Sequence, residues 1–554
     1  MDKPWQCGKI ARLAAGAAFA LLAAAPALSA QYKVLGWNAL GMHCMDVDYG
    51  VFSILLFYNN LHAQVVDITN NKLVSGGMSV TFEATPDLNG SINSYSLGKT
   101  NFWTYAKPLF GVDLAPGIGL GGFATANFTP QTMSFDAASS LFVATGIPIT
   151  PYDDNKVLNT YPMVRVAART AGGSVVAEGH VILPVSDEMT CIACHASGSA
   201  DDAKPNRGWV NDPNKERDYR RNVLSRHDDI SKGRSKYKAA LQQLGYDKAG
   251  LLATADGGRP ILCAACHASH ALPGTGLAGI SALTSATHTL HATVVDPSTG
   301  QLLGDESNRN ACYMCHPGSQ TKCLRGVMGN ATNPDGSLAI QCQSCHATMQ
   351  KVGAKSRVGW LEQPTCQACH HDGKRSLSAV NSKGNLKKPT DTRFATNPDV
   401  PAPGFNLYRF SKGHGGLQCE ACHGSTHAEY TSSHDGDNVQ SIETQGHVGM
   451  LAECNACHTK LPVTANGGPH GLHTIGNSWV GKHGDTAEHD RQSCAYCHGA
   501  DFRGSPLAKT QAARSFNVEG RTVKYSVGQQ VTCYDCHNGP GGGDLMTVSQ
   551  RSQR

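Results

Sequence analysis

The sequence predicts a chain of two parts: a β-rich, sandwich-like domain over residues 31–185, and a domain of loops and short helices around bound groups over residues 186–554. Three observations predict this fold class. The first part holds alternating and β-branched segments, the second holds nine copies of the motif C-x-x-C-H, and glycine is frequent (60 residues) while aromatic residues make up only 7%. With about 40 residues for each motif, the second part has too little chain to build ordinary hydrophobic cores.

Residues 1–30 are expected to be a secretory signal peptide. Basic residues near the start precede an apolar run from Leu13 to Ala27, and cleavage after Ala30 fits the small residues Ser29 and Ala30. The run is too short to cross a bilayer as a mature helix, and no later stretch is long and apolar enough to do so. We therefore expect an exported chain without a transmembrane segment after the signal.

The first part has the pattern of β-strands. Met78–Thr85, Met163–Thr170 and Ser174–Val185 alternate in polarity or are rich in β-branched residues, and Gly, Asn and Pro turns separate them. This pattern favours a small sandwich. In the second part, Asn214–Leu244 has helical spacing, and Ser376–Pro403 is expected to be an exposed loop.

The nine C-x-x-C-H motifs have the spacing by which haem c is attached to a protein. The two thiols form thioether bonds to the porphyrin, and the adjacent histidine binds the iron. The expected attachment residues are Cys191, Cys194, Cys263, Cys266, Cys312, Cys315, Cys342, Cys345, Cys366, Cys369, Cys419, Cys422, Cys454, Cys457, Cys494, Cys497, Cys533 and Cys536. The expected proximal iron ligands are His195, His267, His316, His346, His370, His423, His458, His498 and His537. The sequence thus predicts nine haem c groups and a multihaem cytochrome c fold, with stacked haems as the core of the second part.

Two other uses of C-x-x-C fit this chain less well. Structural zinc needs two cysteine pairs or a Cys/His partner at a fixed distance, and a histidine directly after each second cysteine has no role in that spacing. A thioredoxin-like dithiol would occur once, at a strand-to-helix turn. The spacing of the motifs is irregular, so a solenoid of identical repeats is not indicated either.

The second axial ligand decides what each haem does. Histidines outside the motifs are more numerous than the haems that need them, since the chain has 25 histidines. The distal candidates are His43, His62, His227, His288, His291, His414, His427, His447, His470, His473 and His483. For His270, His371, His434 and His489 a solvated side chain is an equal alternative, and His180 is expected to be structural.

Two cysteines of the expected mature chain, Cys44 and Cys323, lie outside the motifs. An exported protein folds in an oxidising compartment, so a Cys44–Cys323 disulfide is expected, with two separate buried thiols as the alternative. Such a bond would hold His43 beside the third haem, because His43 adjoins Cys44 and Cys323 lies seven residues after His316.

Net charge argues against one class of partner. The formal charge of the chain is +4, but the propionates of nine haems would make the loaded protein negative. A nucleic-acid partner is therefore not indicated.

Several segments resemble a family of multihaem c-type cytochromes from metal-reducing, Geobacter-like bacteria. They include "VLGWNALGMHCMD", "LPVSDEMTCIACHASGS", "CYMCHPGSQTKCLRGVMG", "CEACHGSTHAEY" and "GPHGLHTIGNSW". The resemblance implies exported electron transfer through haems with two histidine ligands, in the periplasm or at the cell surface, with redox proteins or extracellular acceptors as partners. Some relatives in the wider class polymerise into haem-lined filaments, so self-assembly is a further implication of the resemblance.

The sequence favours an electron carrier over an enzyme. Nine haems in so short a chain must lie close together, and two histidines on each iron leave no position for a substrate. The alternative is a multihaem reductase for nitrite, hydroxylamine or a sulfur oxyanion. Such an enzyme needs an open iron, often marked by a variant such as C-x-x-C-K, and no such variant occurs. A filament subunit, in which the β-rich domain serves assembly or docking, is compatible with electron transfer.

Overall fold

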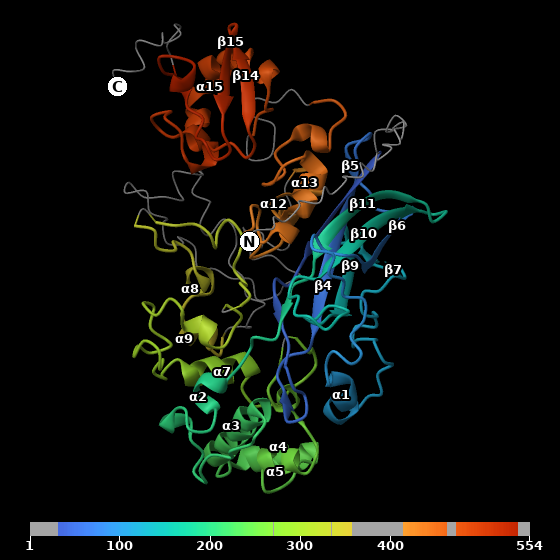
Figure 1. The fold of residues 1–554 in the computed structure, drawn as a ribbon, viewed down its shortest axis with the longest axis vertical. Coiled ribbons are helices and arrows are strands. Elements are labelled where there is room, and N and C mark those ends of the chain that lie inside the picture. Colours follow the sequence, from blue (N-terminus) through green and yellow to red (C-terminus); the bar gives the residue numbers. More distant parts are fainter. Residues whose placement is uncertain are drawn as a thin grey trace, which may run out of the picture.

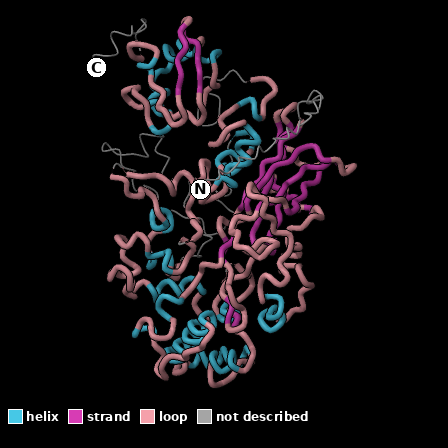
Figure 2. The backbone as a smooth tube through the Cα atoms, in the orientation of Figure 1, coloured by secondary structure: helices cyan, strands magenta, loops and turns pink. Residues whose placement is uncertain are grey.

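The structure is a computed structural model that describes residues 31–269, 271–318, 320–333, 335–356, 414–461 and 472–540. The two sheets of the N-terminal part lie along one side of the molecule (Figure 1). Loops and short helices make up most of the rest (Figure 2). The expected loop at Ser376–Pro403 lies outside the described residues.

Two antiparallel sheets occupy the region where the sequence predicts β-structure. The strand order is β1-β4-β9-β8 in one sheet, with β5 paired to β4, and β11-β10-β6-β7 in the other. The first sheet comprises β1 (Tyr32–Asn38), β4 (Tyr58–Asp67), β5 (Lys72–Leu73), β8 (Ser134–Asp136) and β9 (Leu141–Pro148). The second comprises β6 (Met78–Ala84), β7 (Gln131–Thr132), β10 (Met163–Thr170) and β11 (Val175–Ile182).

The largest hydrophobic core lies between these sheets. Val34 of β1 and Phe142 of β9 are buried in one cluster with Phe82 of β6 and Val166 of β10. The cluster also takes up Phe102 of helix α1 (Phe102–Phe110), a helix that the sequence pattern did not reveal. Side chains alternate across a strand, so each sheet keeps a second face for other contacts.

The outer face of the first sheet is covered by the segment that holds the sixth motif. Leu35 and Trp37 of β1 cluster there with Ala421 of helix α12 (Cys419–His423). His62 of β4 is the register partner of Trp37, so it lies on the same face. The β-rich part thus contributes one wall to the motif region.

The two parts of the chain interlock more closely than the sequence suggests. The expected boundary falls within β12 (Val185–Ser186), which pairs in parallel with β2 (His43–Cys44). Further on, β13 (Ile261–Leu262) pairs with β3 (Phe52–Ser53). A second core joins Phe52 to the helices that follow the first motif. Backbone pairing therefore joins the two expected domains at two places.

The predicted helix at Asn214–Leu244 is two helices, α3 (Lys215–Ser231) and α4 (Ser235–Leu244). The Asn214 side chain caps α3 by accepting hydrogen bonds from the backbone N–H groups of Glu216 and Arg217. The other described α-helices are α2 (Ile192–His195), α5 (Leu251–Asp256), α6 (Cys263–Cys266), α7 (Leu283–His291), α8 (Cys342–His346), α9 (Met349–Val352), α13 (Val439–Gln445), α14 (Asn477–Val480) and α15 (His483–His498).

The described chain ends in a small unit around α15 and a hairpin. Strands β14 (Arg514–Val518) and β15 (Arg521–Tyr525) pair antiparallel. Their two-residue loop has positive φ at Glu519 (49°) and Gly520 (80°), the conformation of a hairpin turn that matches strand twist. In Figure 1 the motif-bearing helices α2, α8, α12 and α15 follow one another along the long axis of the molecule.

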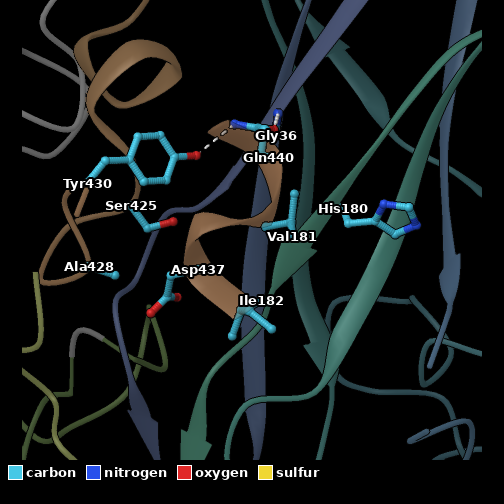
Figure 3. A pocket seen from close by; sticks show the side chains of 9 residues that line it. All are labelled: Gly36, His180, Val181, Ile182, Ser425, Ala428, Tyr430, Asp437 and Gln440. Carbon is cyan, nitrogen blue, oxygen red and sulfur yellow. Dashed lines mark hydrogen bonds between the residues drawn. The ribbon is translucent and has the colours of Figure 1, made fainter. Parts of the chain in front are cut away.

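A small pocket marks where the sandwich meets the segment after the sixth motif. It is lined by Gly36, His180, Val181, Ile182, Ser425, Ala428, Tyr430, Asp437 and Gln440 (Figure 3). Gln440 spans it, since its Oε1 accepts from the Gly36 N–H at 2.6 Å and its Nε2 donates to the Tyr430 hydroxyl at 3.1 Å. On the same interface, the His180 ring lies 2.6 Å from Glu443, which agrees with the structural role expected for it.

Candidate haem sites

Each described C-x-x-C-H motif forms one helical turn, which in the eighth motif is the last turn of the longer helix α15 (His483–His498). In the first motif the His195 N–H donates to the Cys191 carbonyl at 3.0 Å, and His316 and Cys312 of the third motif repeat this contact at 2.9 Å. A turn of this kind brings positions i, i+3 and i+4 to one side. The two thiols and the imidazole of a motif are therefore directed to one place, as covalent attachment of one haem requires.

From residue 263 onward, the described chain has little hydrophobic core of its own. Among the described residues, the buried apolar side chains from 311 to 508 are chiefly alanines, such as Ala311, Ala421, Ala456 and Ala495. The three hydrophobic clusters draw almost entirely on residues before 263. The motif cysteines that the structure describes lie half-buried. A large apolar group at each motif would supply the missing core.

Seven motif histidines each face a histidine from elsewhere in the chain. The ring centres of these pairs lie 5.7–6.4 Å apart. The pairs are His195–His291, His267–His227, His316–His288, His346–His427, His458–His414, His498–His473 and His537–His483. They cover the first to fourth and the seventh to ninth motifs.

This spacing fits one metal ion between the two rings of a pair. An imidazole nitrogen lies about 2 Å from a bound metal and the ring centre about 1 Å beyond, so two rings on opposite sides of one ion have centres about 6 Å apart. In the His414–His458 pair the two Nε2 atoms face each other directly, at 3.4 Å. Ring planes are nearly parallel in the His288–His316 pair (10°) and nearly perpendicular in the His227–His267 pair (86°).

Hydrogen bonds to oxygen fix the tautomer of seven of these fourteen rings. Nδ1 contacts a backbone carbonyl in His267, His288, His291, His473, His483 and His498, at 2.7–3.2 Å. In His458 it contacts the amide oxygen of Asn71 at 2.7 Å. An oxygen of this kind only accepts, so Nδ1 carries the proton and the Nε2 lone pair is left for a metal.

Burial keeps several of these histidines neutral, which is the form that binds iron. Desolvation, with a smaller contribution from the paired ring, lowers the pKa of His195 and of His316 to about 4. The pKa of His427 and that of His473 are also lowered, chiefly by burial. These rings are therefore neutral at neutral pH.

Seven of the eleven distal candidates named from the sequence take part in the pairs, and His447 has different surroundings. His447 is the clearest correction: its Nε2 lies 3.1 Å from Glu453 and its Nδ1 2.8 Å from the Val448 carbonyl, so both nitrogens are engaged. His62 packs edge-on against Trp37. His470 lies outside the described residues.

His43 has surroundings that suit an iron ligand. Among the described residues, no ring contact joins it to a motif histidine. Its Nδ1 bonds to the Leu56 backbone, burial lowers its pKa to about 4, and its Nε2 is buried with no hydrogen-bond partner. The ring packs on Tyr58, with centres 4.2 Å apart. Its role as a distal ligand stays a prediction.

Of the remaining histidines, some have described surroundings and others lie outside the described residues. His434 stacks on Tyr161 at 3.9 Å, and the Nδ1 of exposed His489 bonds to the Asp485 carbonyl at 2.6 Å. The sixth-motif histidine, His423, ends α12 beside the sheet. The fifth motif (Cys366, Cys369, His370), together with His270 and His371, lies outside the described residues.

Cys44 and Cys323 are free thiols that lie near each other. Burial raises the pKa of Cys44, and the nearby Cys323 raises it further by charge repulsion. Ser186 of β12 is the register partner of Cys44 in β2. The hydroxyl oxygens of Ser186 and Thr321 lie 3.1 Å apart. The proximity agrees with the expected pairing, but the disulfide is not formed.

Contacts around the ligands add residues that the sequence did not reveal. Asn71, from the sandwich, holds His458, and Trp479 stacks on His473 with ring centres 4.2 Å apart. No sequence motif marks either residue, because the role of each depends on a tertiary contact. In the described part of the chain no group of three or more His, Cys, Asp or Glu side chains forms a metal site, so the histidines meet as pairs.

No protein-family model, curated protein or solved structure matches this chain. No helix among the described residues has the length and apolar character needed to cross a membrane.

Proposed function

We propose that this chain is an exported electron-transfer protein that holds nine covalent haem c groups, most or all with two histidine ligands. The observation that carries the proposal is the set of seven histidine pairs, each joining a C-x-x-C-H histidine to one from another segment. Haem c, when bound, supplies one-electron exchange at its iron. Two imidazoles saturate that iron and keep its potential below that of a Met/His haem.

Electron transfer over the molecule also requires neighbouring sites, and the first four motifs are in contact. Helix α7 carries both His288 and His291, which face the third and the first motif. The Asn222 amide of α3 donates to the His195 carbonyl at 3.1 Å, and the same helix supplies His227 to the second motif. This argues for the spatial order second, first, third.

The fourth motif joins the third through side chains of the motif itself. Arg309 donates to the Ser344 hydroxyl at 2.9 Å, and Gln343 donates to the Asn308 carbonyl at 2.9 Å. The distal partner of the fourth motif, His427, comes from just after the sixth motif. The order therefore extends from third to fourth to sixth.

The later motifs share peptide segments in the same manner. His414, just before the sixth motif, faces the seventh-motif histidine. His483 begins α15, the helix that ends with the eighth motif, and faces the ninth-motif histidine. Glu453, directly before the seventh motif, forms an ion pair with Arg514 of the C-terminal hairpin. These contacts favour one conduit along the long axis over separate redox sites.

The test is a spectrum and a mass of the exported holoprotein. We expect a denatured mass equal to the mature polypeptide plus nine haems, and a ferric spectrum that is low-spin throughout. Added nitrite or hydroxylamine should leave the spectrum of the reduced protein unchanged. A high-spin ferric band, or reoxidation by either compound at a catalytic rate, would instead identify an open iron and a reductase.

A further inference from the structure

We infer that Cys323 is a positioning residue for the fourth haem: its sulfur holds the ring of His427 and, as a weak acceptor, sets that haem's potential above the value that a carbonyl partner would give. The inference rests on the proposed function, because it takes His427 as the distal ligand opposite His346. It concerns a residue that belongs to no haem motif.

The partner of the His427 ring differs in kind from the oxygen partners described above for seven of the paired rings. Its Nδ1 lies 3.6 Å from the Cys323 sulfur. The comparable Nδ1 contacts described above are to carbonyl or amide oxygen, for example His291 to Thr287 at 2.7 Å. If Nε2 binds the iron, the Nδ1–H of His427 would donate to a thiol, which accepts hydrogen bonds only weakly.

The backbone of His427 is held by the same segment as its ring. Its carbonyl accepts from the N–H groups of Arg325 and Gly326, both at 2.7 Å, and its own N–H donates to Glu429 at 2.8 Å. Its φ is +70°, a region that side-chain-bearing residues adopt only when their surroundings impose it. The residues from Cys323 to Gly326 therefore act as a clamp on His427.

Two further contacts make this clamp rigid. Gly41 packs against the ring: a Cβ there would lie 3.0 Å from the His427 Nδ1, so a larger residue would crowd the ring in this position. Arg325 forms two hydrogen bonds with Asp437, at 2.7 and 2.8 Å, and both side chains are nearly buried. The thiol is thus delivered by a fixed segment and not by a flexible loop.

The chemical consequence follows from the proton on Nδ1. A stronger acceptor draws that proton away, makes the imidazole a better donor to iron, stabilises the ferric state and lowers the potential. A thiol does this less than a carbonyl does.

The test uses three substitutions in the holoprotein, with both thiols kept reduced. C323S introduces a better acceptor and should lower the midpoint potential of one haem, whereas C323A removes the acceptor and should raise it. C44S changes the nearby thiol that is not bonded to the ring and should leave all potentials in place. Potentials are followed by redox titration monitored by electron paramagnetic resonance.

The substitution His427→Ala identifies which haem gives the shifted potential. It also separates a failure of the ligand assignment from a failure of the role of Cys323. If H427A leaves every haem low-spin, His427 is not a ligand and the proposed ligand map fails. If H427A converts one haem to high-spin but C323S and C323A leave that haem's potential at the wild-type value, or shift it in the opposite order, the role of Cys323 is refuted while the ligand map stands.

Discussion

Replacing His291 by Ala is expected to convert one haem of the nine from low-spin to high-spin. Helix α7 places His291 with its ring centre 6.4 Å from that of His195, and His288, one turn away, 6.2 Å from that of His316. The two rings face different motifs, so each single substitution opens one iron and the double substitution opens two. The high-spin fraction should be about one ninth for each single variant and about two ninths for the double variant.

Carbon monoxide measures this fraction directly, because it binds ferrous haem at an open position. The wild-type holoprotein should take up none, H291A and H288A about one equivalent each, and H288A/H291A about two. H447A is the matched control, since both ring nitrogens of His447 already bond to Glu453 and Val448. Carbon monoxide uptake by H447A, or none by H291A, would refute the reasoning from ring pairs to iron ligands.

The remaining predictions concern the contacts that hold the ligand-bearing segments. Asp437→Asn should destabilise the folded holoprotein by about 3–5 kcal/mol in urea unfolding, because it leaves the buried Arg325 charge without its partner; a change below about 1 kcal/mol would contradict this. His180→Gln should lower stability below pH 6.5, and by progressively less as pH rises. The reason is that the hydrogen bond to the α13 carboxylate raises the His180 pKa above its usual value. Stability from a raised pKa is present in acid and is lost as pH rises through the folded-state pKa. A difference between wild type and variant that grows with pH would show that the sign is wrong. In air-oxidised protein, non-reducing peptide mapping should recover Cys44 and Cys323 in one linked peptide, and recovery of both as alkylated free thiols would end that expectation.

For each proposed haem site, the sequence gives the attachment motif as one local unit and the second histidine only as one of several candidates. Cys191, Cys194 and His195 lie within five consecutive residues, so their geometry is local. The partner of His195 is His291, and nothing in the intervening chain states that pairing. The pairing depends on how α7 packs, which spacing alone does not encode.

Failures of sequence reasoning have the same origin. His447 stands close before the seventh motif and has the context of a ligand, but Glu453 and the distant Arg514 engage it instead. The strand pattern located the sandwich, yet the parallel pairing of Ile261–Leu262 with Phe52–Ser53 involves segments too short to show alternation. Short contacts between remote segments leave no periodic trace.

The separation between the two ligands of each pair has a consequence for how the protein is made. A C-x-x-C-H motif is complete on an extended chain, so its thioether bonds can form before any tertiary structure exists. The second imidazole of the pair arrives from another segment, as His427 does for the fourth motif. Under the proposed function, maturation would therefore be ordered in time. The motif histidine would bind first, the second histidine would bind only after its own segment has docked, and His427 would do so for the fourth motif.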